Sequence, residues 1–460
     1  MDPLSVTLLA TDEDSRDERK KKDMKERILL KNINLFDVEN DILRNNVDIL
    51  IEGDIIKVVG KVNHTEEENL THIDCSGKFA IPGLFECHAH LALLTSPDEE
   101  TKKQIMEDFG TTNENELEKQ VLKEFVVRGI TQVRDVGGPV KVLKDLKDSI
   151  SNGEFPGPDI FYAGPMLEKS PLLWEEQNEA LPGFTVAVNS KPDAKNIIKE
   201  IANGGASLVK TFNKFDFDVF RYLLDQAKEY DLPVVHDPGT TLFQSIPMDL
   251  GIDLGIRCFE HGKAPWPIVL KDDLKPEHDS LIEADPKDKE ALRKKIFSLG
   301  IESISLTKLR QLIDKMLQND VYFCPTLHAF KYMQAQPSEE PNKDMLDKLE
   351  VLVRISLFFT KEMIKQNVKI LVGQDGLMPK FTFDEMRYLK ELGLSESEII
   401  KGATIYPAEW MGIVDQFGSI SPNKKANILI LNENPLEDIQ NIKTTHAVLR
   451  NGTIEFQEES

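Results

Sequence analysis

The amino-acid sequence predicts an α/β protein, a (β/α)8 barrel of the TIM type with a small β-sandwich domain formed by both chain ends. Between residues 81 and 412, short β-branched runs alternate with amphipathic stretches, as buried parallel strands alternate with helices. Eight such runs occur, which is the number that closes a parallel barrel. At 460 residues, the chain is long enough for one barrel and an accessory domain.

The accessory domain is expected to combine residues 28–80 with residues 413–460. Both stretches are rich in short β-type runs, but neither has enough strands to bury a core by itself. Gly53 separates two runs near the start, and Asn451-Gly452 is a preferred pair for a two-residue hairpin turn near the end. We therefore expect hairpins at both places and pairing between the two ends.

The barrel is expected to occupy residues 81–412. Its eight predicted strands are IPGLFECHAH, GITQVRDVG, PDIFYAG, ASLVKTF, LPVVHD, IRCFEHG, VYFCPTL and VKILVGQDG. Ser395 and Glu398 have the spacing of a capping box, which predicts the start of the last helix. Residues 271–295 are too charged for a core and are predicted to form a solvated insertion after the sixth strand.

Charge and composition exclude several classes of partner. The formal net charge is -23, and we find no basic stripe, so nucleic acid is not expected as a partner. No stretch approaches the roughly 20 apolar residues that span a bilayer, so no membrane partner is expected either. Residues 1–27 are charged, are expected to be mobile, and lack the apolar run of a signal peptide. We expect a cytoplasmic protein unless its N-terminus is a processed one, and whether it forms a homo-oligomer is open.

The four cysteines are scattered along the chain without paired spacing. This pattern argues against a disulfide framework and against a cysteine-based zinc site. A reducing compartment is the simpler interpretation.

Two histidines lie at the end of the first predicted barrel strand. Alternate side chains of a strand share a face, so His88 and His90 point the same way while Cys87 and Ala89 point the other way. The C-terminal ends of barrel strands form the face where active sites lie. Taken alone, such a pair is weak support for a site, because both could be incidental core or surface histidines.

Other strand ends supply compatible side chains. His236 ends the fifth strand, His261 the sixth, and Asp375 the eighth. Each alone has a structural interpretation: the histidines as hydrogen-bonded core residues, the aspartate as a helix cap. Together they suggest a site for a divalent ion of the zinc type, because packing does not require this arrangement.

Lys210 is the fourth strand's contribution to the same face. An ammonium beside histidines would repel a cation, so its charge has to be neutralised. A desolvated lysine can lose its proton, and the free amine can add carbon dioxide to form a carbamate that bridges two metal ions. The alternative is a lysine that reaches the rim or pairs with a nearby acid.

At these residues, the chain resembles the amidohydrolase superfamily and, within it, the prolidase and imidazolonepropionase-like branch. The resemblance extends from the N-terminal strands to the end of the chain. Its carriers are PGLFECHAHL, GITQVRDVGG, GASLVKTF, LPVVHD, FEHG, GQDG and GATIYPAEWMGIVDQFGSISPNKKANILILNENPLEDI. The resemblance implies a β-sandwich plus a barrel that carries a binuclear metal centre.

In that resemblance, His88 and His90 hold the more buried metal ion, and His236 and His261 hold the other. Carboxylated Lys210 bridges the two ions, and Asp375 binds metal and handles protons. The two ions are expected to be divalent, with zinc as the first choice, although the same ligands accept manganese, iron or cobalt.

The sequence also departs from the family pattern. Glu86 and Gln374 stand where relatives usually carry aspartate and threonine, and Asn427 stands where aspartate is common. The third strand runs into AGPMLEKSPLLW instead of the glycine and histidine motif of many dipeptidase-like members. This last departure puts a preference for proline dipeptides in doubt.

These features predict a metal-dependent hydrolase that cleaves a carbon–nitrogen bond of the amide type in a small molecule. Metal-activated hydroxide is expected to attack the carbonyl, with Asp375 as the general base and then the general acid. His328, Glu168 and Trp174 follow barrel strands and are candidate substrate contacts. The bond could belong to a dipeptide, an N-acyl amino acid, a cyclic amide, a urea or a carbamate.

Two other functions are weighed against this one. A deaminase of the same fold with one metal ion commonly needs a glutamate just after the fifth-strand histidine, where this chain has aspartate. A catalytically silent scaffold would usually have lost ligands, whereas all six predicted ligands are present.

Overall fold

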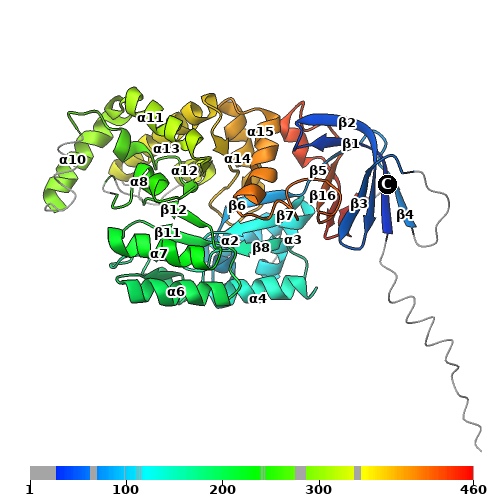
Figure 1. Cartoon of the computed structure of the whole chain (residues 1–460), viewed down its shortest axis with the longest axis horizontal. Helices are drawn as coiled ribbons and strands as arrows, with labels where there is room; N and C mark the ends of the chain where they lie inside the picture. The colour runs from blue at the N-terminus through cyan, green and yellow to red at the C-terminus, as the bar shows by residue number, and fades with distance from the viewer. Residues whose placement is uncertain are drawn as a thin grey trace, which may run out of the picture.

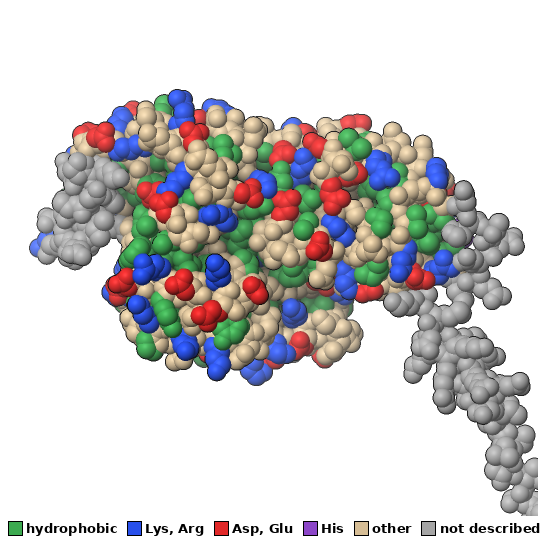
Figure 2. Space-filling model, viewed as in Figure 1, with side chains coloured by type: hydrophobic (Ala, Val, Ile, Leu, Met, Phe, Trp, Pro, Cys, Tyr) green, Lys and Arg blue, Asp and Glu red, His purple; other side chains and the backbone are tan. Residues whose placement is uncertain are grey.

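The computed structural model describes residues 27–62, 70–97, 99–110, 113, 116–239, 242, 244–274, 286–335 and 343–458. Residues 1–26, most of the stretch predicted to be mobile, lie outside this part of the chain. In the described part, no helix is both long enough and apolar enough to span a bilayer. Figure 2 shows basic and acidic side chains interspersed over one face.

Both ends of the chain contribute to one mixed sheet, at one end of the molecule (Figure 1). Its strands are β1 (Arg27–Asp37), β2 (Ile42–Glu52), β3 (Ile55–Gly60), β4 (Leu70–Asp74), β5 (Phe79–Pro82), β16 (Ile428–Leu431), β17 (Thr445–Arg450) and β18 (Thr453–Gln457). Strand β16 pairs antiparallel with β5, so the predicted pairing between the two ends is confirmed. Apolar side chains from both ends enclose a core of their own, among them Ile49 and Ile430.

The two predicted hairpins are present. Strands β2 and β3 pair antiparallel around Gly53, which has a φ of +60°. Strands β17 and β18 pair antiparallel around Asn451 and Gly452, whose φ values of +48° and +75° lie in the left-handed region. The turn residues therefore supply the backbone conformation that a tight hairpin requires.

All eight predicted barrel segments contain parallel strands. They are β6 (Leu84–Ala89), β7 (Ile130–Asp135), β8 (Asp159–Tyr162), β11 (Val209–Phe212), β12 (Val234–Asp237), β13 (Cys258–Glu260), β14 (Tyr322–Cys324) and β15 (Lys369–Ile370). They form a three-stranded sheet, β6-β7-β8, and a longer sheet that runs from β11 to β15 in chain order. Two short strands absent from the prediction, β9 (Met166–Glu168) and β10 (Thr185–Ala187), extend the longer sheet beyond β11.

Backbone hydrogen bonds join the two parallel sheets at both edges. The Cys87 amide donates to the carbonyl of Val372 over 2.9 Å, and the Ser207 amide donates to the carbonyl of Tyr162 over 2.9 Å. These bonds link β6 to the end of β15 and β8 to the start of β11. Each of these bonds thus connects the shorter parallel sheet to the longer one.

Helices cover the parallel strands on the outside (Figure 1). The longer ones are α2 (Glu99–Phe109), α3 (Leu117–Val127), α4 (Val140–Ser151), α6 (Lys191–Asn203), α7 (Phe217–Glu229), α10 (Pro286–Leu299), α11 (Leu306–Gln318), α12 (Leu327–Ala335), α13 (Lys343–Lys365) and α14 (Lys380–Glu391). The shorter ones are α5 (Gln177–Ala180), α8 (Met248–Asp253), α15 (Glu396–Gly402) and α16 (Ile405–Trp410). Part of the predicted insertion at residues 271–295 is helix α10, and residues 275–285 lie outside the described chain.

The predicted start of the last helix is confirmed. The Ser395 side chain accepts a hydrogen bond from the Glu398 amide, as the capping-box spacing predicted. The helix then ends near Ala403, and a second helix, α16, begins at Ile405. Gly402 packs against β15 at this break, and a Cβ atom there would lie 2.3 Å from the Ile370 carbonyl oxygen.

Asp159, at the start of β8, ties the terminal sheet to the parallel strands. Its carboxylate accepts hydrogen bonds from Arg450 over 3.1 Å, from Asn451 over 3.0 Å and from Asn427 over 3.1 Å. Asn427, which stands where relatives commonly have aspartate, is thus a neutral donor to this carboxylate. Asp159 thus connects the C-terminal strands to β8 through three hydrogen-bond donors.

We predict that Asp159→Ala lowers the free energy of unfolding by about 2 kcal/mol, because it leaves three half-buried donors without their acceptor. Asp145→Ala is the matched control, because it removes only an exposed ion pair with Lys141 within one helix. It should change the free energy of unfolding by less than about 0.5 kcal/mol. Urea unfolding measures both values. Equal effects of the two variants would contradict the proposed role of Asp159.

Candidate metal centre

The histidine pair lies where β6 ends. His88 is 1% exposed, and the ring centroids of His88 and His90 are 5.4 Å apart. The Nδ1 of His90 lies 3.1 Å from the Gly137 carbonyl oxygen, which can only accept, so this nitrogen carries the proton. The Nε2 atoms of His88 and His90 are then available on the side of Asp375, at 3.4 and 3.6 Å from its Oδ1.

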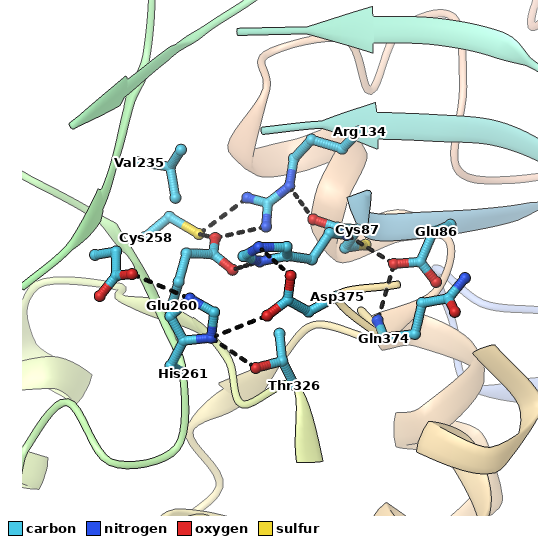
Figure 3. Close-up of polar contacts among 12 residues, drawn as sticks. Glu86, Cys87, Arg134, Val235, Cys258, Glu260, His261, Thr326, Gln374 and Asp375 are labelled. Carbon is cyan, nitrogen blue, oxygen red and sulfur yellow. Dashed lines mark hydrogen bonds and ion pairs between the residues drawn. The ribbon is translucent and has the colours of Figure 1, made fainter. Parts of the chain in front are cut away.

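Three residues of the site that follow parallel strands have left-handed backbone. His261 follows β13 with a φ of +68°, Thr326 follows β14 with +48°, and Asp375 follows β15 with +55°. Such conformations are uncommon for residues other than glycine and concentrate at functional sites. They redirect the chain, so that side chains just past three strands meet at one place (Figure 3).

His261 contacts three residues there. Its Nδ1 lies 2.8 Å from the Thr326 hydroxyl and 3.7 Å from Oδ2 of Asp375, and its Nε2 lies 3.1 Å from Oδ2 of Asp237. Burial alone would raise the pKa of Asp237, but His261, Lys263 and Lys210 hold it well below its ordinary range. Asp237 is therefore an anion at neutral pH, and it fixes the orientation of the His261 ring.

Lys210, on β11, is 1% exposed, and its ammonium nitrogen has no hydrogen-bond partner among the described residues. Its charge acts on His88, His90, Asp237, Glu260 and Asp375, which places it beside the cluster. A buried ammonium without a partner is costly. The predicted alternatives, a rim position or an ion pair, therefore do not describe this lysine.

His236 does not join the cluster, which differs from the prediction. In the parallel register, Thr211 pairs with His236 while Lys210 pairs with Val235, so His236 and Lys210 are on opposite faces. The Nε2 of His236 lies 2.9 Å from the Ile246 carbonyl oxygen and its Nδ1 lies 2.9 Å from the Thr211 hydroxyl. Both ring nitrogens are in use, and Asp237, one residue on, reaches the site instead.

Glu260 and Arg134 form a buried ion pair next to His261 and Asp375 (Figure 3), and this pair also supports His88. The Glu260 carboxylate accepts from His88 Nδ1 over 2.6 Å and from Arg134 over 2.6 Å. Burial lowers the pKa of His88 to about 4, although Asp375 and Glu260 oppose this effect. His88 is thus a neutral imidazole that donates from Nδ1 and keeps the lone pair of Nε2 for the cluster.

Glu86 links β6 to the chain that follows β15. Its Oε1 accepts from the amides of His88 over 2.7 Å and Gln374 over 3.0 Å, and its Oε2 accepts from the Thr382 hydroxyl over 2.7 Å. Burial raises the pKa of Glu86 to about 7, against the effect of these donors. Glu86, which stands where relatives usually carry aspartate, therefore sets the distance between β6 and the loop that carries Asp375.

The candidate substrate residues are placed in three different ways. His328 is 6% exposed, is stacked on Phe381 with ring centroids 4.1 Å apart, and has no hydrogen-bond partner for either ring nitrogen in the described structure. Glu168 is buried, accepting from the Leu173 amide over 2.6 Å and from the Asn213 side chain over 3.0 Å. Trp174 is 49% exposed. Of the three, His328 is the one with buried polar atoms that lack a hydrogen-bond partner in the described structure, although its Nδ1 lies 3.9 Å from Oδ2 of Asp384.

Sequence reasoning missed Asp237, Glu260 and Arg134. Asp237 and Glu260 stand next to predicted histidines in LPVVHD and FEHG, so both were visible as acids at strand ends. Alternation along β12, counted from Lys210 through the strand pairing, would have favoured Asp237 over His236. Arg134 gave no comparable signal, because nothing in its neighbourhood indicates that a fully buried guanidinium would pair with Glu260.

The donor atoms of His88, His261 and Asp375 lie within 4.8 Å of one another, with His90 and Lys210 beside them. Imidazole nitrogens and a carboxylate oxygen are suitable ligands for a divalent ion of the zinc type. Burial alone would raise the pKa of Asp375, but His88, His261, His90 and Lys210 hold it below its ordinary value. The cluster therefore presents an ionised carboxylate at neutral pH.

Part of the chain matches a known protein family. Residues 311–454 match the model of the amidohydrolase family. A curated relative, the 5-methylthioadenosine/S-adenosylhomocysteine deaminase of Dictyoglomus turgidum, is 45% identical over 67 residues, which cover 15% of this chain and 15% of that protein. The match thus spans about 15% of the relative's length.

The similarity to solved structures extends along nearly the whole chain. A Xaa-Pro dipeptidase with bound methionine in the active site has a TM-score of 0.70 at 20% identity, over 94% of this chain and 100% of that one. Molinate hydrolase has a TM-score of 0.69 at 17% identity, over 94% of this chain and 95% of that one. The resemblance of this chain to the amidohydrolase superfamily, first visible in its strand-end motifs, is confirmed by the family match and by the shared TIM-barrel-type fold.

Proposed function

We propose that this protein is an amidohydrolase, a metal-dependent hydrolase that cleaves a carbon–nitrogen bond of the amide type in a small molecule. The observation that carries the proposal is the meeting of His88, His261 and Asp375 from three strand ends, with His90 and Lys210 beside them. We also propose the closed eight-stranded barrel and the sandwich of the two chain ends as the scaffold. The cytoplasmic location remains a prediction from the sequence.

The residues fit a divalent metal centre. His88, His90, His261 and Asp375 would hold the metal, and Lys210 would bridge two ions if its amine were carboxylated. Lys210 supports this assignment because its buried nitrogen has no partner in the described structure. Asp237 replaces His236 in our ligand set, since it lies 3.1 Å from the ring of His261 and the nitrogens of His236 are engaged elsewhere.

Bound metal would polarise the carbonyl and supply hydroxide at neutral pH. The chain's own residues provide the rest. Asp375 is ionised, partly exposed and close to three histidines, so it can accept a proton and return it to the leaving nitrogen. His328, with two unused ring nitrogens, is retained as a candidate contact to a substrate oxygen.

Two alternatives remain for the test to decide. A deaminase with one metal ion is supported by the short stretch shared with the deaminase of Dictyoglomus turgidum. Against it, Lys210 would have no role with one ion, and aspartate replaces the glutamate that such enzymes commonly carry after the fifth-strand histidine. A catalytically silent scaffold would have no reason to keep the arrangement around Asp375. Metal-loaded protein should be assayed against N-acyl amino acids, dipeptides, ureas, carbamates and nucleosides.

We predict that Asp375→Asn keeps bound metal but loses at least about 100-fold in kcat, because the amide cannot accept the proton. Elemental analysis and turnover of the best substrate are the two measurements. Asp145→Asn, on the exposed face of α4, is the control and should retain wild-type turnover. An Asp375→Asn enzyme within a few fold of wild type would remove Asp375 from the mechanism.

We predict about two metal ions per wild-type chain and one or fewer in Lys210→Ala, because the bridging ligand is lost. Elemental analysis after dialysis against zinc checks both values. Lys141→Ala, an exposed lysine of α4, should bind as many ions as wild type. One ion in both the wild type and Lys210→Ala would favour the deaminase, and no ion in wild type would favour the scaffold.

We predict that Glu260→Gln lowers the free energy of unfolding by about 3 kcal/mol or more, because it leaves the Arg134 charge buried and unpaired. The same change should weaken zinc binding about 10- to 100-fold, since His88 loses the anion that orients its ring. Chemical unfolding and competition with a zinc chelator measure the two effects. Unchanged zinc affinity in a folded variant would show that Glu260 serves stability alone.

A further inference from the structure

The turn between β14 and α12 brings a hydroxyl group to the candidate metal centre. Thr326 is fully buried, has a φ of +48°, and lies directly before Leu327, the first residue of α12. Its hydroxyl lies 2.8 Å from Nδ1 of His261 (Figure 3). A hydroxyl can accept a hydrogen bond from Nδ1–H, and the lone pair of Nε2, on the side of Asp237, is then free for a metal ion. Thr326 therefore influences which nitrogen of His261 binds metal.

Thr326 occupies the position from which a threonine usually caps a helix. The first amides of a helix have no partner within it, and a threonine hydroxyl just before the helix commonly accepts from one of them. The hydroxyl of Thr326 is turned to His261 instead. The amides at the start of α12 therefore need another acceptor.

Glu385, on α14, is that acceptor. Its Oε1 accepts from the Leu327 amide over 3.1 Å, and its Oε2 accepts from the His328 amide over 2.7 Å. The side chain is fully buried, and burial raises the pKa of Glu385 to about 8, against the effect of these two amides. A carboxyl group has an oxygen that can accept in either protonation state. Helix α12 is thus capped by a side chain from another helix.

Two contacts at the start of α14 fix the position of Glu385. The Thr382 hydroxyl donates to Oε2 of Glu86 over 2.7 Å, which connects α14 to the strand that carries His88. The Phe381 ring is stacked on the ring of His328, with centroids 4.1 Å apart. The acceptor for α12 is therefore held in place by contacts with both β6 and α12.

We propose that Glu385 is a positioning residue for the candidate metal centre: it caps α12 in place of Thr326, so that the Thr326 hydroxyl is free to hold the ring of His261. Without Glu385, two buried amides lose their acceptor, which is unfavourable. The Thr326 hydroxyl is the nearest group in the chain that can replace it, and turning to the amides removes the hydroxyl from His261. This proposal rests on the proposed function, in which His261 binds metal.

A double-mutant cycle tests the proposal, with affinity for zinc measured by competition with a chelator. Glu385→Met removes the acceptor at similar volume, and Thr326→Val removes the hydroxyl at similar shape. Each change alone should weaken zinc binding about tenfold, and the double variant should bind zinc within about twofold of Thr326→Val. Glu385→Gln, which keeps one acceptor, should restore most of the affinity. Glu391→Met, at an exposed position of α14, is the matched control and should change nothing.

The contact can also be measured without metal. In metal-free protein with nitrogen-15-labelled histidine, the Nδ1 resonance of His261, identified by its loss in His261→Gln, reports the hydrogen bond with Thr326. Glu385→Met and Thr326→Val should shift this resonance in the same direction, because both remove the hydroxyl from the ring. Glu391→Met should leave it unshifted.

Additive losses of zinc affinity in the double variant would overturn the proposal, since Glu385 would then act independently of Thr326. An unshifted His261 resonance in folded Glu385→Met would overturn it as well. If Glu385→Met does not fold, Glu385→Gln takes its place in both measurements, with a smaller expected effect. Failure of the proposed function gives a different result: wild type then binds no zinc, while the His261 resonance still responds to Glu385.

Discussion

The carboxylate of Glu260 is the contact on which the arrangement of the site depends. One of its oxygens binds the buried Arg134 guanidinium and the other binds Nδ1 of His88, each over 2.6 Å. Arg134 in turn donates to the Cys87 carbonyl over 2.5 Å and to the Cys258 sulfur over 3.2 Å. A single ion pair inside the parallel strands therefore fixes β6 against β13 and sets which nitrogen of His88 faces the cluster.

The carboxylates around this pair favour an added cation at the centre. Asp237 and Asp375 are anions held below their ordinary pKa values, and the imidazole of His88 is neutral. Lys210 and Lys263 are buried cations for which the described chain provides no carboxylate partner at ion-pair distance. Carboxylation of Lys210 would convert its buried positive charge into a negative one, which suits a centre that binds cations.

Much of this could be predicted from the sequence, since it depends on periodicity. The eight strand segments, the two hairpins and the pairing of the chain ends follow from β-branched runs and turn residues, and all are present. The histidine pair was predictable because alternation keeps His88 and His90 on one face.

The prediction for His236 was wrong because β12 has only four residues. Without the pairing of β12 with β11, its sequence does not show which of two adjacent residues faces the site. His261, by contrast, reaches the site because its left-handed backbone breaks the alternation. A long-range partner such as Arg134 leaves no local pattern at all.

The central claim is that a metal ion binds where His88, His261 and Asp375 meet. Anomalous diffraction from crystals soaked in zinc, recorded on both sides of the zinc absorption edge, tests it directly. The account predicts peaks bordered by these three residues and by His90, Asp237 and Lys210, with none at the ring of His236. A peak at His236, or none near Asp375 in zinc-saturated crystals, would contradict it.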